Sequence, residues 1–271
     1  MENERFDVWA VGGAYQRYMG RWSSLVAEEF TAWLNCPDGL RYVDVGCGTG
    51  ALSAVVAARC RPRSVVGADR SEGFVRSARR GAPAPACFVV ADAMSLPLRA
   101  AACDVALSGL ALNFFPAATT AVAEMARVVR PGGLIAGYVW DYAGGMELLR
   151  SFWDAAVGVD ASASPWDEAR RFSLCRPEAL REVWGEAGLV EVSTTSIEVP
   201  TVFPDFADLW EPLLAGQGPA PSYVATLAPA DRERVRHALS DALARRPDGS
   251  IRLAARAWAV RGRRAVDATQ G

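Results

Sequence analysis

The chain has 271 residues, of which 51% are hydrophobic and 22% are charged, and its formal net charge is −2. This composition is typical of a globular protein and argues against a disordered or fibrous chain. The small net charge gives no electrostatic reason to expect a nucleic acid or a membrane surface as partner. All 29 basic residues are arginine. The absence of lysine excludes Schiff-base chemistry and indicates GC-rich codon usage.

The 6 cysteines and the single histidine show no metal-binding pattern. No two cysteines form a C-x-x-C pair, so we predict no metal site and expect reduced, mostly buried thiols. The acidic N-terminus does not resemble a signal peptide. No run reaches the roughly 18–20 apolar residues of a membrane span. We therefore expect a cytoplasmic protein without a membrane partner.

Between Arg41 and Trp140, short apolar runs alternate with helical patterns. We predict strands over Arg41–Val45, Ser64–Asp69, Ala86–Ala91, Cys103–Ser108 and Leu134–Trp140, and helices over Ala51–Cys60, Glu72–Arg80 and Ala117–Val129. Because the strands are apolar on both faces and are separated by helices, they predict a parallel sheet with helices on each side.

Further elements flank this region. The first 35 residues carry an aromatic-rich helical pattern, which we expect to cover the sheet edge or the cleft. Residues Asp141–Arg171 predict an irregular segment. After them we predict a helix over Pro177–Gly188, a strand over Leu189–Val199, a helical insertion over Thr201–Pro247, a strand over Ile251–Val260 and a frayed tail from about Arg263. The last two strands predict an antiparallel edge hairpin.

A glycine-rich turn follows the first strand, in the run VDVGCGTG of residues 43–50. Gly46, Gly48 and Gly50 permit positive φ angles and a close approach of the backbone to a ligand. Since a helix begins directly after the turn, its free amide groups add to the site. A turn in this position indicates a nucleotide-like ligand at the carboxyl end of the sheet.

Two cofactors compete for this turn. The spacing of Gly46, Gly48 and Ala51 also fits the loose dinucleotide pattern, which is typical of NAD(P)-dependent oxidoreductases. Asp44 favours a different ligand, because a carboxylate repels a pyrophosphate but attracts the free ammonium group of S-adenosylmethionine (SAM). The alternative is that Asp44 only accepts hydrogen bonds from amides of the loop.

Acidic residues also follow the next two strands. Asp69, at the end of the second strand, can accept hydrogen bonds from both ribose hydroxyls, in a SAM enzyme and in an NAD enzyme alike. Asp92 follows the third strand, where its carboxylate suits the exocyclic amine of adenine. The alternative for Asp92 is the N-cap of a helix.

The runs VDVGCGTG, GADRS, VVADAMSLPLRAAACDVALS and EMARVVRPGGLI resemble the successive motifs of class I SAM-dependent methyltransferases. They are most similar to the small-molecule methyltransferases related to ubiquinone and menaquinone biosynthesis, and the resemblance covers about Arg41–Trp140. It implies an α/β fold with a doubly wound, Rossmann-like sheet of seven strands, mostly parallel with an antiparallel last strand. We expect one domain over residues 1–271, with a helical N-terminal cover (1–38), a SAM-binding core (39–140), two insertions that cap the acceptor site (141–175 and 201–248) and the last strand (249–262).

The cofactor contacts expected within the motifs follow from the same resemblance. They are Asp44, Gly46, Cys47, Gly48, Gly50, Asp69, Arg70, Ser71, Asp92, Ala93, Ser108 and Leu110. The resemblance implies that Gly46–Gly50 line the methionine part, that Asp69 binds the ribose and that Asp92 and Ala93 meet the adenine. It also implies that the stretch from Ser108 to Leu110 lies beside the methyl donor.

Two positions depart from the patterns of related enzymes. Relatives often have an apolar residue where this chain has Arg70, although a guanidinium can still stack on adenine. The run Leu112–Phe115 lacks the Asn-Pro-Pro-aromatic pattern of nucleic-acid and protein-amide methyltransferases. We therefore expect no nucleic-acid partner.

Methyl transfer from a sulfonium needs mainly orientation of donor and acceptor and exclusion of water, because the donor is already activated. A general base is needed only where the acceptor holds its proton. The candidates, all weak, are Tyr15, Tyr18, Asp141 and His237. For His237, which lies in a charged helical run, a solvent-facing structural role is the stronger interpretation.

Aromatic side chains near the N-terminus suggest a lid. On a helix, Tyr15, Tyr18 and Trp22 share one face, with Arg21 beside them. We expect Tyr18, Arg21 and Trp22 to close on SAM, with Arg21 meeting its carboxylate. The alternative is an ordinary core-packing stripe.

The sequence as a whole predicts a SAM-dependent methyltransferase that acts on a small-molecule acceptor and releases S-adenosylhomocysteine (SAH). One alternative is an NAD(P)-dependent oxidoreductase on a similar sheet. A second alternative is a SAM-binding protein without catalysis.

Overall fold

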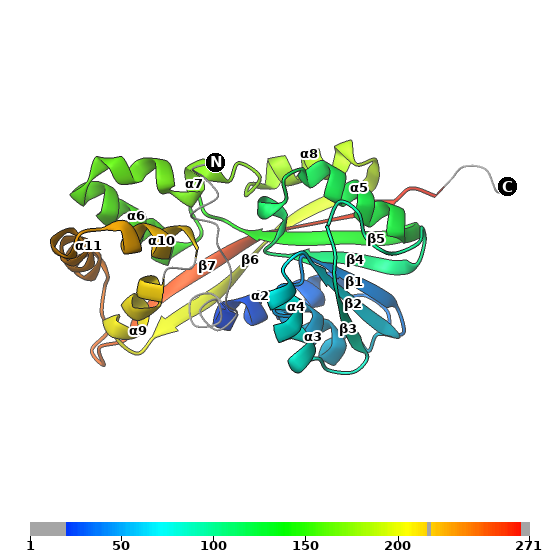
Figure 1. Cartoon of the computed structure of the whole chain (residues 1–271), viewed down its shortest axis with the longest axis horizontal. Helices are drawn as coiled ribbons and strands as arrows, with labels where there is room; N and C mark the ends of the chain where they lie inside the picture. Colours follow the sequence, from blue (N-terminus) through cyan, green and yellow to red (C-terminus); the bar gives the residue numbers. More distant parts are fainter. Residues whose placement is uncertain (1–19, 216–217, 267–271) are drawn as a thin grey trace. The chain divides into compact units, whose positions relative to one another are not determined.

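The computed structural model describes residues 20–215 and 218–266, and its central feature is a seven-stranded sheet (Figure 1). The sheet order is β3-β2-β1-β4-β5-β7-β6. The strands are β1 (Arg41–Val45), β2 (Ser64–Asp69), β3 (Ala86–Val90), β4 (Cys103–Gly109), β5 (Val129–Trp140), β6 (Leu189–Phe203) and β7 (Ile251–Arg264). β1 to β5 pair in parallel and β7 runs antiparallel, so the predicted α/β fold class is confirmed.

Helices connect the strands. The α-helices are α2 (Arg21–Leu34), α3 (Ala51–Arg59), α4 (Glu72–Arg80), α5 (Ala118–Val128), α6 (Glu147–Val159), α7 (Glu168–Arg171), α8 (Pro177–Glu186), α9 (Phe206–Trp210), α10 (Pro219–Thr226) and α11 (Pro229–Ala242). The 3-10 helices among the described residues are η3 (Leu112–Phe114), η4 (Ala161–Trp166) and η5 (Glu211–Ala215). Within the described residues, no helix is both long enough and apolar enough to cross a membrane.

The chain divides into two compact units. We name residues 23–139, 174–197 and 257–266 the sheet unit, and the described residues of 20–22, 140–173 and 198–256 the helical unit. In the sheet unit, α5 and α8 lie together on one side of the sheet, and α2, α3 and α4 lie on the other (Figure 1). The predicted insertion 201–248 falls in the helical unit, as does 141–175 apart from its last two residues.

The central strands form the core of the sheet unit because they are apolar on both faces. Val43, Val105 and Ile135 come from β1, β4 and β5, and all three side chains are fully buried. Helices pack on each side of these strands, and the order of the sheet reverses between β1 and β4. In a doubly wound sheet, such a reversal leaves a crevice at the carboxyl ends of the strands.

β5 begins earlier than the sequence predicts. We expected Pro131–Gly133 to separate a helix from a strand that begins at Leu134, but these residues form a bulge inside β5. The register passes from Cys103↔Val129 to Val105↔Leu134, so β5 holds extra residues between the two pairs. Gly132 has a φ of 72°, a conformation that glycine accommodates without strain.

The prediction that Asp141–Arg171 is irregular was wrong, because α6, η4 and α7 occupy most of it. The apolar side chains of α6 recur at helical spacing, and Leu148, Leu149, Phe152 and Trp153 are buried. In the helical unit α6 packs against α11, which lies far from it in the sequence. Tertiary packing therefore stabilises a helix that we did not predict from the local sequence pattern.

β6 and β7 are both longer than predicted. The sequence predicts that the strand beginning at Leu189 ends at Val199, before Pro200, but β6 continues to Phe203 with alternating burial. Pro200 fits because β6 is the edge strand of the sheet, where a missing amide donor costs little. β7 likewise continues through Arg263, where we expected a frayed tail, to Arg264.

The sheet is closely packed around Gly67 in β2. A Cβ atom there would lie 2.4 Å from Phe88 Cδ1 and 3.0 Å from Cys47 Sγ. We predict that Gly67→Ala lowers the free energy of unfolding by about 1–3 kcal/mol, because the core must expand to admit a methyl group. Gly81→Ala is the control, since no atom lies within 4 Å of its added Cβ. Urea unfolding of both variants tests this, and equal stabilities would contradict it.

Candidate functional site

The glycine-rich turn lies between β1 and α3 and is fixed by backbone hydrogen bonds. The amides of Gly46 and Cys47 both donate to the carbonyl of Ala68, at 2.8 and 3.1 Å. The amide of Gly50 donates to the carbonyl of Cys47 at 2.9 Å. These bonds attach the turn to the end of β2 and fix its conformation.

The three glycines of the turn have positive φ angles of 74°, 54° and 90°, but they differ in their surroundings. A Cβ at Gly46 would lie 2.4 Å from Ala111 Cβ, and one at Gly50 would lie 3.2 Å from Phe88 Cζ. At Gly48 the added atom would meet nothing within 4 Å. Gly46 and Gly50 are therefore required for packing, whereas Gly48 borders open space.

Asp44, in β1, carries a buried carboxylate that is only half satisfied. Its side chain is 1% exposed, and Oδ2 accepts a hydrogen bond of 2.6 Å from Ser53 Oγ. Oδ1 is buried and has no hydrogen-bond partner among the described residues. Burial raises the pKa of Asp44 to about 7, opposed by hydrogen bonding from Ser53 and reinforced by the charge of Asp69. The vacant oxygen suits a cationic donor.

Asp69, at the end of β2, is held by the backbone on both oxygens. Oδ2 accepts from the amide of Gly48 at 2.9 Å, and Oδ1 accepts from the amide of Ser71 at 2.8 Å. Ser71 in turn caps α4, because its Oγ accepts from the amide of Phe74. Each carboxylate oxygen keeps a further lone pair, so Asp69 can accept two more hydrogen bonds in a fixed orientation.

Asp92 follows β3 and closes a short turn. Its Oδ1 accepts from the amide of Met94 at 2.9 Å, and its backbone carbonyl accepts from the amide of Ser95 at 3.1 Å. No helix begins here, so the alternative interpretation as a helix N-cap was wrong. Asp92 is exposed and Ala93 is half-buried.

The other predicted contacts in the motifs lie at the same ends of the strands. Ser108, in β4, is fully buried and its Oγ has no hydrogen-bond partner among the described residues. Leu110 follows β4 with a φ of 58°, and its amide donates to the carbonyl of Tyr138 at 2.8 Å. Cys47 is buried and Arg70 is exposed. The carboxyl ends of β1, β2, β3 and β4 thus carry all these residues.

The candidate residues outside the motifs have different surroundings. Asp141 Oδ2 accepts hydrogen bonds from Arg256 Nε and Nη2, at 2.8 and 2.6 Å. This ion pair occupies the carboxylate and favours a structural role over that of a base. His237 lies on the surface of α11, where its Nε2 is 2.9 Å from Arg236 Nη2.

The predicted lid lies partly outside the residues that the structure describes. Tyr15 and Tyr18 are outside the described residues, and Arg21 is the first residue of α2. Trp22 is buried in the helical unit, where its ring meets that of Phe203 edge-on at 5.2 Å. This contact favours the alternative interpretation of Trp22, in which its side chain belongs to a core-packing stripe and does not contact the cofactor.

Sequence reasoning missed two side chains with buried polar atoms. Ser53 is fully buried in α3 and donates to Asp44; a hydroxyl in the first turn of the helix after the glycines was the available signal. Asn113, in η3, has a buried Nδ2 without a hydrogen-bond partner among the described residues. Within the described part of the chain, no group of three His, Cys, Asp or Glu residues is arranged to hold a metal.

Comparison with known proteins agrees with this geometry. Residues 43–137 match the family described as methyltransferase domain. The chain is 35% identical over 115 residues to malonyl-[acyl-carrier protein] O-methyltransferase of Methylococcus capsulatus, a match that covers 41% of this chain and 42% of that protein. It is 31% identical over 150 residues to a tRNA (carboxymethyluridine(34)-5-O)-methyltransferase of Macaca fascicularis, covering 51% and 21%. The chain therefore spans less than half the length of these two relatives.

A solved structure shares the fold. Phosphoethanolamine N-methyltransferase 2 of Haemonchus contortus, in complex with SAM, superposes with a TM-score of 0.56 at 14% identity over 93% of this chain and 56% of that one. Residues 43–137 therefore match a methyltransferase domain, which supports the resemblance to class I SAM-dependent methyltransferases. The same match supports SAM as the cofactor.

The different surroundings of Gly46 and Gly48 predict different stabilities. Both Gly46→Ala and Gly48→Ala incur the backbone cost of a side chain at positive φ, roughly 1 kcal/mol. Gly46→Ala adds a clash with Ala111, which we expect to cost a further 1–3 kcal/mol or so. Denaturant unfolding without ligand measures both, and a Gly48→Ala variant as unstable as Gly46→Ala would show that the space at Gly48 is filled.

Proposed function

We propose that the chain is an active methyltransferase that transfers the methyl group of SAM to a small-molecule acceptor. The observation that carries the proposal is the buried carboxylate of Asp44, whose Oδ1 has no partner among the described residues. A buried anion of this kind is costly unless a cation pairs with it. The α-ammonium group of SAM supplies such a cation, whereas the pyrophosphate of NAD would repel it. The proposal therefore favours SAM chemistry over the oxidoreductase alternative.

The remaining contacts follow along the cofactor. The turn of Gly46, Cys47, Gly48 and Gly50 would hold the methionine part, with open space at Gly48. Asp69, already oriented by two amides, would accept the ribose hydroxyls. Asp92 and Ala93 would meet the adenine, with Arg70 stacked beside it. Ser71 would support Asp69, and Ser108 and Leu110 would lie near the methyl group.

The chain itself contributes orientation and shielding from water. The bound cofactor supplies a methyl group already activated on a sulfonium. The residues of the turn and the three strand ends would fix the direction from which an acceptor approaches, which is worth several kcal/mol of the barrier. No general base is assigned, because Asp141 is held by Arg256 and His237 is exposed.

Two features support a small-molecule acceptor over a nucleic acid. The net charge of −2 offers no basic surface by composition. The run Leu112–Phe115 lacks the pattern that serves extruded bases. The two relatives are named for a malonyl group on an acyl-carrier protein and a carboxymethyluridine of tRNA, so a macromolecule carries each acceptor, but both acceptors contain a carboxyl group. Small carboxylic acids are therefore the first class of acceptor to test, followed by phenols and amines.

Transfer of label from methyl-labelled SAM tests the function. Purified protein is incubated with labelled SAM and pools of small carboxylic acids, phenols, amines or bulk tRNA, with Gly48→Val as the inactive control. We expect transfer to a small-molecule pool. Transfer of label to tRNA alone would contradict a small-molecule acceptor. Calorimetric binding of SAM without transfer to any pool or to a cell extract would favour the alternative of a SAM-binding protein without catalysis.

Loss of the ribose contact predicts a weaker complex. We expect Asp69→Ala to lose roughly 1–3 kcal/mol of SAM affinity, because two charge-assisted hydrogen bonds disappear. Asp248→Ala is the matched control, since Asp248 accepts from the amide of Ser250 as Asp69 does from Ser71 but lies in the helical unit. Calorimetry measures both, and an unchanged affinity in folded Asp69→Ala would remove the ribose assignment.

The pKa of Asp44, raised to about 7, predicts a pH dependence of binding. The free protein keeps its proton below that pH, so the carboxylate that pairs with the ammonium group must first lose it. SAH affinity should therefore rise by up to about tenfold per pH unit from pH ~5 to ~7 and level off above. The stability of the free protein should run the opposite way, falling as pH rises from about 4 to 7 because only the unfolded chain ionises there.

Calorimetry with SAH from pH ~5.5 to ~8.5 measures the binding. Asp44→Asn removes the titrating group and should flatten the profile while weakening binding at the upper end. A wild-type profile as flat as that of Asp44→Asn would contradict the pairing with the ammonium group.

A further inference from the structure

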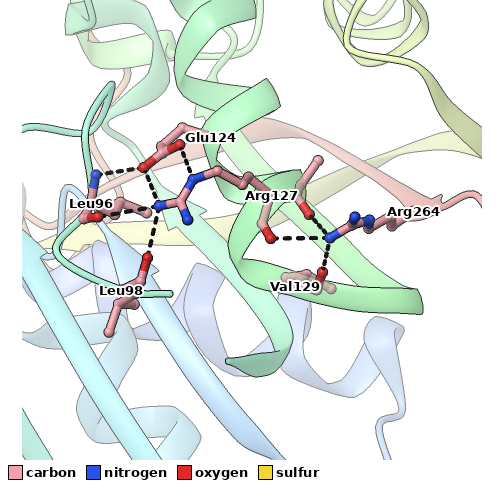
Figure 2. Close-up of polar contacts among 7 residues, drawn as sticks. Leu96, Leu98, Glu124, Arg127, Val129 and Arg264 are labelled. Carbon is pink, nitrogen blue, oxygen red and sulfur yellow. Dashed lines mark hydrogen bonds and ion pairs between the residues drawn. The ribbon is translucent and has the colours of Figure 1, made fainter. Parts of the chain in front are cut away.

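The segment that leads from β3 to β4 is attached to α5 by side-chain hydrogen bonds (Figure 2). Glu124 Oε1 accepts from the amide of Leu96 at 2.7 Å. Arg127 Nη2 donates to the carbonyl of Leu98 at 2.8 Å and to that of Leu96 at 3.3 Å. Two side chains three residues apart on α5 thus hold both backbone polar groups of Leu96, a residue that is itself buried.

Glu124 and Arg127 also fix one another. Arg127 Nε donates to Glu124 Oε2 at 2.6 Å, and Arg127 Nη2 donates to Glu124 Oε1 at 2.7 Å. The hydrogen bonds from Arg127, followed by that from the amide of Leu96, lower the pKa of Glu124 against an opposing effect of burial. The pair is a two-pronged, charge-assisted contact, so it holds the Leu96–Leu98 backbone in a defined position.

The C-terminal end of α5 is anchored from β7. Arg264 Nη1 donates to the carbonyls of Ala126, Arg127 and Val129, at 3.2, 3.0 and 2.7 Å (Figure 2). A cation at this end of a helix satisfies carbonyls that have no partner in the helix. The turn of α5 that carries Arg127 therefore gives Leu96 and Leu98 a rigid support.

The turn at Asp92 lies between two anchors. On one side the amide of Ala91 donates to the carbonyl of Asp69 at 3.0 Å. On the other side stands Leu96, held by Glu124 and Arg127. Asp92 itself is exposed, so burial does not fix its carboxylate. Hydrogen bonds from the amides of Met94 and Ser95 hold Asp92 within the turn, and the anchors at the two ends hold the turn itself in place.

We propose that Glu124 and Arg127 are positioning residues for the adenine end of the cofactor site, acting through Leu96 on the carboxylate of Asp92. The inference rests on the proposed function, because it takes Asp92 as the residue that meets the adenine. Neither side chain needs to touch the cofactor. Loss of the contact leaves Asp92 bonded to Met94 within its turn, but the turn is anchored at one end only, so the cofactor must order it on binding.

A double-mutant cycle on SAH affinity tests this coupling. Glu124→Ala removes the acceptor for the amide of Leu96 and the partner of Arg127, and we expect about fivefold to twentyfold weaker SAH binding. Glu124→Gln keeps an acceptor oxygen and should recover part of the loss. In an Asp92→Ala background, Glu124→Ala should cost less than about twofold, because the carboxylate that it positions is gone.

Glu186→Ala, at the end of α8, is the matched control because Glu186 also contacts α5. Glu186 Oε2 accepts from Thr119 Oγ1 of α5, but Glu186 is exposed and forms no hydrogen bond with Leu96 or Leu98. This variant should bind SAH as the wild type does. Hydrogen exchange gives a second readout: Glu124→Ala should speed exchange in residues 92–98 of the ligand-free protein and leave residues 46–50 unchanged.

The outcomes distinguish failure of the positioning role from failure of the proposed cofactor site. If Asp92→Ala weakens SAH binding but Glu124→Ala does not, or if the two losses add in the double variant, the positioning role is overturned while the cofactor site stands. If the wild type does not bind SAH, or if Asp92→Ala has no effect, the adenine assignment fails and the positioning role fails with it. Should Glu124→Ala not fold, the same cycle with Glu124→Gln decides, with a smaller expected loss.

Discussion

The buried carboxylate of Asp44 is the constraint on which the site depends. β1 lies in the sheet between β2 and β4, so this side chain cannot reach water by a small movement, and Ser53 satisfies only one of its oxygens. A fold optimised for stability alone would place an apolar residue here, since an unpaired buried charge costs several kcal/mol. The position therefore indicates a ligand that completes the carboxylate, and the neighbouring space at Gly48 indicates where that ligand lies.

Much of the sheet was predictable because the central strands are buried on both faces. β1 and β2 begin and end at the predicted residues, since an apolar run bounded by polar or glycine residues has one register in a parallel sheet. The errors lie where distant segments decide. Packing against α11 stabilises α6. β6 tolerates Pro200 because it is the edge strand of the sheet, and the bulge at Pro131–Gly133 depends on pairing with β4.

The site was predictable to a similar degree and for a related reason. Residues that follow successive parallel strands must lie at one edge of the sheet, so Asp44, Asp69 and Asp92 were expected together from the sequence. Their hydrogen-bond partners were not, because the amide of Gly48 reaches Asp69 only after β1 and β2 pair. The role of Trp22 could not be predicted, because the sequence pattern of aromatic side chains on a helix face is the same whether they cover a ligand or pack against a residue such as Phe203.

The same hydrogen bonds imply that the two ends of the cofactor site differ in rigidity. Gly48 donates to Asp69, and Ser71 holds the other oxygen, so the groups proposed for methionine and ribose already form one connected unit. The turn at Asp92 is exposed, and α5 supports it only through Leu96 and Leu98. A site ordered in advance loses little entropy on binding, whereas a turn held at a distance loses more when its anchor weakens. Affinity for the adenine part should therefore be more sensitive to changes in α5 than affinity for the methionine and ribose parts, although α5 is not proposed to touch the cofactor.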